Sequence, residues 1–340
     1  MVETPNTSRG LALVAVAFDD RKDTLIQTAV SLAKRCGLAL KLIHGVEPPT
    51  YDSLAVETPT VVSIPTALVE DMARQLRERR MEMTALVERL RKSHIDITGE
   101  VIEGDAVRTV ISAAVNARAN LIITACHPPG NRFLPVGFST ALSLMHEAPL
   151  PVLVVGRRPT DWEKASLRFL IADDLQTSTR EATLKGFEMA ALFPKSHIRH
   201  VHVHGDFREA LTDTWRDIKD KIPGLKTENV TPETIWRDEY EARLHALTRQ
   251  SLPFRRLAEK ADVFIEPDIR TGKVQEEIHN VIQEFDPDLC VFGRHRLVRT
   301  KPFLIGRMPL RTMIEEERAI LVVPPKEDLY AALPFPAALQ

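Results

Sequence analysis

The chain has 340 residues, of which 44% are hydrophobic and 27% are charged. These values are close to globular averages and exclude a disordered, collagen-like or coiled-coil chain. At about 150 residues per domain, the length predicts two domains. The 45 Lys and Arg residues nearly balance the 47 Asp and Glu residues, for a net charge of −2, which argues against bulk electrostatic binding of nucleic acid.

The sequence predicts no membrane segment and no disulfide framework. The apolar run from Leu11 to Phe18 ends at Asp19, so it is too short to span a bilayer and is a poor signal peptide. Three cysteines, Cys36, Cys126 and Cys290, lack the paired spacing of a zinc site or a redox dithiol. We therefore expect a cytoplasmic protein without membrane association.

The first half of the chain alternates strand-like and helix-like segments. The run Leu11 to Ala17 is typical of a strand buried on both faces of a parallel sheet. An apolar stripe over Thr24 to Cys36 predicts a helix that ends at Gly37. A strand, a long charged helix, a strand, a helix and two strands should follow over residues 38–44, 67–93, 95–102, 107–117, 120–124 and 151–155. This alternation predicts an α/β fold with a mainly parallel sheet.

The same order then begins again. Strands are predicted over 168–172, 198–204, 263–268, 289–292 and 320–323, and helices over 180–193, 240–260 and 274–285. The polar joint Gly156 to Ser166 has the composition of a short linker. We predict tandem domains over 1–157 and 163–325, followed by a C-terminal tail over 326–340. The extra segment 205–237 of the second copy is expected to be an irregular or helical cap, and its role is not predicted.

The two halves end in similar segments. EAPLPVLVV at Glu147 to Val155 ends the first half, ERAILVVP at Glu317 to Pro324 ends the second, and Gly104-Asp105 precedes a predicted helix. With the ordered elements, these residues resemble the universal stress protein family in its tandem, two-domain form. The resemblance covers nearly the whole chain. It implies that each domain is a Rossmann-like, five-stranded parallel sheet of the adenine-nucleotide α-hydrolase type.

ATP-binding members of that family have an Asp after the first strand and a loop of Gly, two residues, Gly, nine residues and Gly-Ser or Gly-Thr. Glycines suit this loop because its backbone must approach phosphate closely. In the first domain, Ala17 stands at the Asp position, Ala125, Pro128 and Phe138 stand at the Gly positions, and Ser139 alone is kept. The resemblance therefore implies that the first domain does not bind ATP in the ordinary way.

The second domain keeps more of this pattern. Asp174 ends its first strand, and Gly293 and Gly306 take the first and third Gly positions. By resemblance, Asp174 and the backbone near Val203 would contact a base, and the loop would contact ribose and phosphates. The alternative is that Asp174 caps the turn that follows it and that the glycines satisfy turn geometry.

The loop Arg294 to Arg307 of the second domain is rich in basic residues. Arg296 and Arg307 replace the second Gly and the Ser of the family pattern. Arginine offers a planar fork that binds phosphate or carboxylate through two hydrogen bonds, although a solvated basic loop neutralised by Glu315, Glu316 and Glu317 is the alternative. The candidate nucleotide- or anion-binding site comprises Asp174, Val203, Gly293, Arg294, Arg296, Gly306 and Arg307. Its ligand would be ATP or another phosphate-bearing molecule.

The sequence predicts no catalytic apparatus. G-x-S-x-G, Walker and G-x-G-x-x-G motifs do not follow any predicted strand. His200, His202 and His204 share one strand face, but such neighbours seldom converge on a metal without ligands from elsewhere, so no metal is assigned. The resemblance implies a non-enzymatic stress-response regulator that binds unidentified protein partners or a small ligand. One alternative is an ATP- or phosphate-dependent switch or slow ATPase that uses only the second domain, and another is a ligand-free scaffold.

Each domain ends in a short apolar strand, over 151–155 and 319–323. Such a strand would expose unpaired backbone groups if it lay at a sheet edge. Since single-domain members of the family dimerise through this strand, the resemblance implies that the two last strands pair with each other. The chain would then be an internal pseudo-dimer, and a further homodimer is left open.

Overall fold

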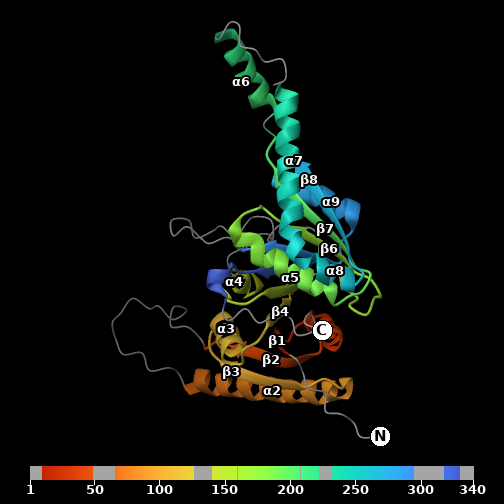
Figure 1. Cartoon of the computed structure of the whole chain (residues 1–340). Coiled ribbons are helices and arrows are strands. Elements are labelled where there is room, and N and C mark those ends of the chain that lie inside the picture. Colours follow the sequence, from red (N-terminus) through yellow and green to blue (C-terminus); the bar gives the residue numbers. More distant parts are fainter. Residues whose placement is uncertain are drawn as a thin grey trace, which may run out of the picture. The chain divides into compact units, whose positions relative to one another are not determined.

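The computed structural model describes residues 10–48, 66–125, 140–158, 160–206, 208–221, 231–294 and 318–329. The chain divides into two compact units, with the main division between Glu163 and Lys164. Each unit contains a five-stranded parallel sheet with helices packed on it (Figure 1), so the predicted fold class is confirmed. Within the described ranges, no helix is both long enough and apolar enough to cross a membrane. The domain boundaries at 157, 163 and 325 stay predictions.

The first unit follows the predicted order of elements. Its sheet has the order β3-β2-β1-β4-β5, and every pair of neighbouring strands within it is parallel. The carboxyl ends of its strands therefore lie at one edge. The strands are β1 (Gly10–Ala15), β2 (Leu38–Val46), β3 (Ile97–Glu103), β4 (Leu121–Ala125) and β5 (Val152–Val155), and the helices are α1 (Lys22–Cys36), α2 (Thr66–Leu90), η2 (Arg91–Ser93), α3 (Ala106–Asn116) and α4 (Thr140–Glu147).

The second unit repeats this topology. Its sheet has the order β10-β9-β6-β7-β8, again with parallel neighbours. The strands are β6 (Arg168–Ala172), β7 (His197–His204), β8 (Phe264–Thr271), β9 (Leu289–Gly293) and β10 (Ala319–Val323). The helices are η4 (Thr177–Thr179), α5 (Arg180–Ala191), α6 (Arg208–Lys221), α7 (Pro232–Ser251), η5 (Leu252–Phe254), α8 (Arg255–Lys260), α9 (Val274–Phe285) and η6 (Lys326–Asp328).

The helix α1 ends where the sequence predicts. Gly37 adopts a left-handed conformation with φ +65°, and its N–H donates to the carbonyl of Ala33. Glycine takes this conformation without the steric cost that a Cβ imposes. Leu25, Ala29 and Leu32 of α1 are buried, as the apolar stripe predicts.

One predicted helix is wrong in its start and in its continuity, although its end at residue 260 is confirmed. The sequence predicts a single helix over 240–260, whereas α7 begins at Pro232 and η5 separates it from α8. Thr231 and Thr234 form a capping box around Pro232, which is a strong start signal. The helix is interrupted at Pro253, because proline lacks an N–H and its ring clashes with the preceding turn. Within the segment 205–237, the described residues are mainly helical, and α6 lies beyond the outer end of α7 (Figure 1).

Apolar packing holds both sheets. Leu13, Ile122 and Leu153 of the first sheet and Leu170 and Val291 of the second are fully buried. Burial of each such side chain contributes about 1.5–3 kcal/mol. Cys36 and Cys290 are free and buried, and burial raises the pKa of the Cys36 thiol to about 12, so this thiol is inert at neutral pH.

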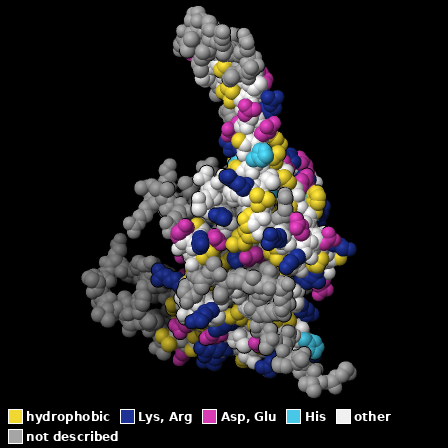
Figure 2. Space-filling model, in the orientation of Figure 1, with side chains coloured by type: hydrophobic (Ala, Val, Ile, Leu, Met, Phe, Trp, Pro, Cys, Tyr) yellow, Lys and Arg dark blue, Asp and Glu magenta, His cyan; other side chains and the backbone are white. Residues whose placement is uncertain are grey.

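Charged side chains cover the surface without separating by sign. Figure 2 shows basic and acidic groups interspersed on the face in view, as the net charge of −2 indicates. On α2, for example, Arg79 donates to Glu82 at 2.6 Å and Gln75 donates to Asp71 at 2.8 Å. The helix that the sequence predicts to be charged thus carries exposed groups of both signs that pair with each other.

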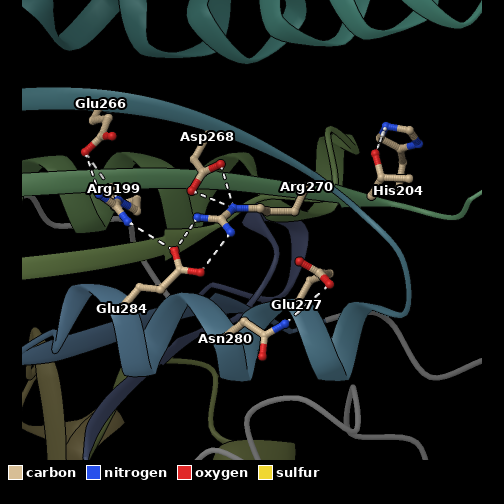
Figure 3. Close-up of polar contacts among 9 residues, drawn as sticks. Arg199, His204, Glu266, Asp268, Arg270, Glu277, Asn280 and Glu284 are labelled. Carbon is tan, nitrogen blue, oxygen red and sulfur yellow. Dashed lines mark hydrogen bonds and ion pairs between the residues drawn. The ribbon is translucent and has the colours of Figure 1, made fainter.

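Ion pairs fix the outer strand β8 to its neighbours. Arg199 of β7 donates to Glu266 at 2.9 Å, and Arg270 binds both Asp268, at 2.9 and 3.0 Å, and Glu284 of α9, at 2.6 Å (Figure 3). Charged residues on an edge strand also oppose pairing with other chains. The network therefore anchors β8 and protects the edge of the sheet.

Candidate functional site

The same backbone arrangement recurs at the carboxyl ends of the strands in both units. The N–H of Val16 donates to the carbonyl of Ile43 at 2.8 Å, and the N–H of Asp173 donates to the carbonyl of Val201 at 2.8 Å. The next residues, Ala17 and Asp174, therefore occupy matching positions. We call Val16, Ala17, His44 and Ala125 the first edge, and Asp173, Asp174, His202 and Gly293 the second edge.

Side chains repeat this correspondence. Nδ1 of His44 lies 2.7 Å from the carbonyl oxygen of Val16, and Nδ1 of His202 lies 2.8 Å from that of Asp173. Gly104 and Gly272 follow β3 and β8 with φ +146° and +145°, a conformation that favours glycine. The units thus share detailed geometry as well as topology.

Gly293 is required by close packing. It pairs in register with Val323, as Ala125 pairs with Val155, so the two residues match as the sequence comparison predicts. A Cβ at Gly293 would lie 2.7 Å from Cγ2 and 3.0 Å from Cα of Thr179. The turn before α5 therefore packs directly on the end of β9, and this contact explains the glycine without a ligand.

Asp174 holds the turn that follows it. Its Oδ1 accepts hydrogen bonds from the backbone N–H of Gln176 at 2.8 Å and from the hydroxyl of Thr179 at 2.6 Å. This is the capping role that the sequence offers as the alternative to base binding. Its contact with a base stays a prediction.

Asp173 is the centre of a buried hydrogen-bond network. Its carboxylate accepts from Nε2 of His200 and from the Thr183 hydroxyl, both at 3.0 Å, and from the Leu175 N–H at 2.7 Å. The Thr179 hydroxyl lies 3.2 Å away. Three donors, from β7, from α5 and from the loop that follows β6, thus converge on one carboxylate, which ties these elements together.

The electrostatics of Asp173 match this structural role. Burial raises the pKa of its carboxyl group, but the hydrogen bond and charge of His200 and the other donors lower it, and the net pKa is below the ordinary value. The Asp173 and His200 side chains are 0% and 1% exposed. A substrate therefore has no access to this acid–base pair.

The other predicted site residues are only partly described. Val203 lies near the end of β7 in register with Arg270, and the N–H of Arg294 donates to the carbonyl of Val323 at 2.8 Å. Arg296, Gly306 and Arg307 lie outside the described residues, as do Pro128, Phe138 and Ser139 of the first domain. The structure therefore brings Asp174, Val203 and Gly293 to one sheet edge, and the assembly of the whole site stays a prediction.

The first edge borders a cavity of about 230 Å³, lined by residues that include Ala17, Lys22, His44, Ala106, Thr124 and Thr140. Arg21 also lines it. Nη2 of Arg21 donates to the carbonyl of Gly156 at 2.6 Å, and its Nη1 is buried with no hydrogen-bond partner among the described residues. Ligand pockets usually measure about 300–1,000 Å³, so this cationic cavity suits a small ligand.

Phe18 stands between basic groups close to this cavity. Its ring lies 5.6 Å from Nζ of Lys22 and 5.5 Å from the guanidinium of Arg79, within cation–π range. His44 packs edge-on against the same ring at 5.0 Å. The cations at the first edge therefore include Arg21 and Lys22, and the carboxylate of Asp19 also lines the cavity.

A sequence model of the universal stress protein family matches residues 12–156. The first unit belongs to the universal stress protein family. The match ends close to the last residue of β5 and so covers the complete first sheet except for its first two residues. No curated protein matches the chain in sequence.

Solved structures extend the likeness to both units. A universal stress protein from Archaeoglobus fulgidus is similar in fold with a TM-score of 0.61 and 15% identity, over 93% of this chain and 97% of that chain. A protein of unknown function from Pseudomonas aeruginosa is similar with a TM-score of 0.57 and 18% identity, over 95% of each chain. At these identities the likeness shows the fold alone. The chain thus has a tandem, Rossmann-like architecture that begins with a universal stress protein domain.

Sequence reasoning missed two groups at the edges. Asp173 is not among the predicted site residues, although Thr179 and Thr183 supply polar partners for its buried carboxylate. Nothing in the sequence signals that Arg21 of the universal stress protein domain reaches the backbone of Gly156. Three of the four histidines of β7, His200, His202 and His204, are engaged in hydrogen bonds. The described part of the chain contains no group of three or more His, Cys, Asp or Glu residues that could hold a metal.

Proposed function

We propose that the protein is a cytoplasmic, non-enzymatic regulator of a stress response that acts by binding a partner protein or a small ligand. The membership of the first unit in the universal stress protein family supports the stress-response role. The proposal that the protein is not an enzyme rests on how the carboxylates of the second edge are bound. Asp173 and Asp174 both accept hydrogen bonds from their own loop, so neither is presented as a general acid or base.

The first edge supports a small anion as the ligand. Its cavity combines Lys22 with the unpartnered Nη1 of Arg21, and a buried donor without an acceptor costs about 1–3 kcal/mol unless it is satisfied. An anion that accepts from Nη1 would recover this free energy. The proposal therefore places ligand binding in the first unit, whereas the sequence comparison points to the second.

The test uses the full chain and measures both hydrolysis and thermal stabilisation. We expect no release of phosphate from ATP above a buffer control, and a rise in melting temperature with phosphate or small carboxylates. Lys22→Met should remove this rise, because Lys22 faces the cavity. Lys92→Met, at an exposed lysine on η2, should keep it.

Two results would contradict the proposal. ATP hydrolysis that Asp174→Ala abolishes would favour the slow ATPase of the second domain. Stabilisation by an anion that Asp174→Ala removes and Lys22→Met preserves would place the ligand at the second edge.

A further inference from the structure

We propose that His202 is the core of a pH-sensitive latch that holds the N-terminal part of α7 on the end of β7 and releases it when the imidazole is protonated. The latch comprises His202, His204, Arg243 and Trp236. It is independent of any ligand at either edge.

The hydrogen bonds of His202 require a neutral ring. Nδ1 lies 2.8 Å from the carbonyl oxygen of Asp173, and Nε2 lies 3.1 Å from Nη1 of Arg243 on α7. A carbonyl can only accept and a guanidinium can only donate. Nδ1 therefore carries the proton and Nε2 accepts from Arg243. Protonation of Nε2 would replace this hydrogen bond with two facing cations.

His204 joins the same contact surface. Its Nδ1 donates to the carbonyl of Gly205 at 3.1 Å, and Nε2 lies 3.1 Å from the hydroxyl of Thr271 on β8. The indole of Trp236 on α7 lies 5.0 Å from its ring. Arg243 and Trp236 thus attach two successive turns of α7 to two histidines on the same face of β7.

Burial, more than the neighbouring charges, opposes protonation of the two histidines. Burial first lowers the pKa of His202, and Arg243 and His204 lower it further, against the raising effects of the Asp173 carbonyl and carboxylate. Burial and Arg243 also lower the pKa of His204, against the carbonyl of Gly205 and the charges of Glu239 and Asp206. Arg243 itself stays charged and is held by Glu239 at 2.6 Å. The latched state therefore binds fewer protons than the released state.

The sign of the pH dependence follows. Both histidines have pKa values below the ordinary 6.5 in the latched state. Their contribution to the stability of the latched state is therefore present above pH 6.5 and is lost as the pH falls below it. A proton taken up on release shifts the equilibrium by up to about tenfold per pH unit.

Little apolar burial opposes release. Of the residues of α7, all of which the structure describes, Leu247 and Ser251 are buried, and both lie in the C-terminal part of the helix. The contacts of the remaining part of the helix with β7 include those of Trp236 and Arg243. Segments with few buried apolar contacts open locally at low free energy.

The experiment is hydrogen exchange of the full chain at pH 7.5 and 5.5, with rates converted to protection factors to remove the intrinsic pH effect. We expect protection over residues 232–244 to fall by about tenfold at pH 5.5, while protection in α5 stays unchanged. His202→Gln keeps an acceptor that does not titrate, so the fall should shrink to the part that is due to His204. His245→Gln, at an exposed histidine of the same helix, should leave it intact.

A second variant keeps the test informative if His202→Gln does not fold. Arg243→Met keeps both histidines but removes the facing cation, so the fall should shrink although basal protection of α7 is lower. Equal protection at both pH values in the wild type would overturn the latch. An undiminished fall in both His202→Gln and Arg243→Met would also overturn it.

Discussion

The first and second edges share a backbone and differ in what their side chains do with it. At the first edge, Val16 and Ala17 leave a cavity bordered by Arg21 and Lys22. At the second edge, the matching Asp173 and Asp174 accept hydrogen bonds from the loop and from α5, and the turn before α5 packs on the end of β9. The two residues that follow the first strand are thus apolar at the first edge, whereas at the second edge they are carboxylates whose hydrogen bonds are made within the unit.

The two edges show that the backbone fold and the side chains of the site can vary independently. The hydrogen bonds of Val16 and Asp173 to the second strand have the same length, so the sheet tolerates either residue type. Function depends on the side chains placed on that backbone. A duplicated domain can therefore keep its topology while the side chains at the two corresponding edges differ.

The largest effect should come from giving the second edge the residue of the first. Asp173→Val leaves His200, Thr183 and the Leu175 N–H without their acceptor, and removing one partner of a buried polar pair costs about 3–5 kcal/mol. Chemical denaturation of the full chain measures the free energy of unfolding. A loss below about 1 kcal/mol, typical of an exposed pair, would show that the network does not hold the second unit.

Variants in the last strand of each domain test whether these two strands pair with each other. Ile122 N–H donates to the carbonyl of Pro151, and Arg294 N–H donates to that of Val323. Since backbone groups of alternate residues face opposite neighbours, those of Val154 and Val322 face away from β4 and β9. If the two last strands pair as the sequence predicts, Val154→Pro or Val322→Pro should cost about 3 kcal/mol. Wild-type melting of both variants would defeat the pairing.

Exchange at the ends of the fourth strands should have a smaller effect. Gly293→Ala places a Cβ against the Thr179 backbone, and such overpacking costs about 1–3 kcal/mol. The reverse change, Ala125→Gly, creates no clash and should cost about 0.5–1 kcal/mol through backbone entropy. Thermal denaturation compares the two variants. Equal effects would mean that the turn before α5 can move away from β9.

The smallest effect is expected at the predicted ligand residue. Asp174→Ala, which supplies the residue of the first edge, removes hydrogen bonds to Gln176 and Thr179 and should cost about 1 kcal/mol. Asp161→Ala, which removes a similar bond to Glu163 in an exposed turn, is the control. If ATP binds the second domain, calorimetry should also show that binding is lost in Asp174→Ala. ATP binding that this variant leaves unchanged would contradict the predicted role.

Local pattern was sufficient for most of the fold. The strand 168–172 and the helix 274–285 coincide with β6 and α9, because an uninterrupted apolar run and a regular apolar stripe leave few alternatives. The start of α7 was missed because its capping box stands before a charged segment without a clear apolar stripe. Its break at Pro253 is a local signal that the sequence interpretation passed over.

The sequence by itself determined the duplication, the α/β class and the matching of Ala17 with Asp174 and of Ala125 with Gly293, since these depend on order and spacing along the chain. Only the tertiary structure decided what the matched residues contact. The partners of Asp173 come from β7 and α5, and those of His202 come from the loop after β6 and from α7. Hydrogen bonds form only between groups about 3 Å apart. A sequence pattern does not give the distance between side chains on separate elements. The contacts of each edge are therefore known only from the folded structure.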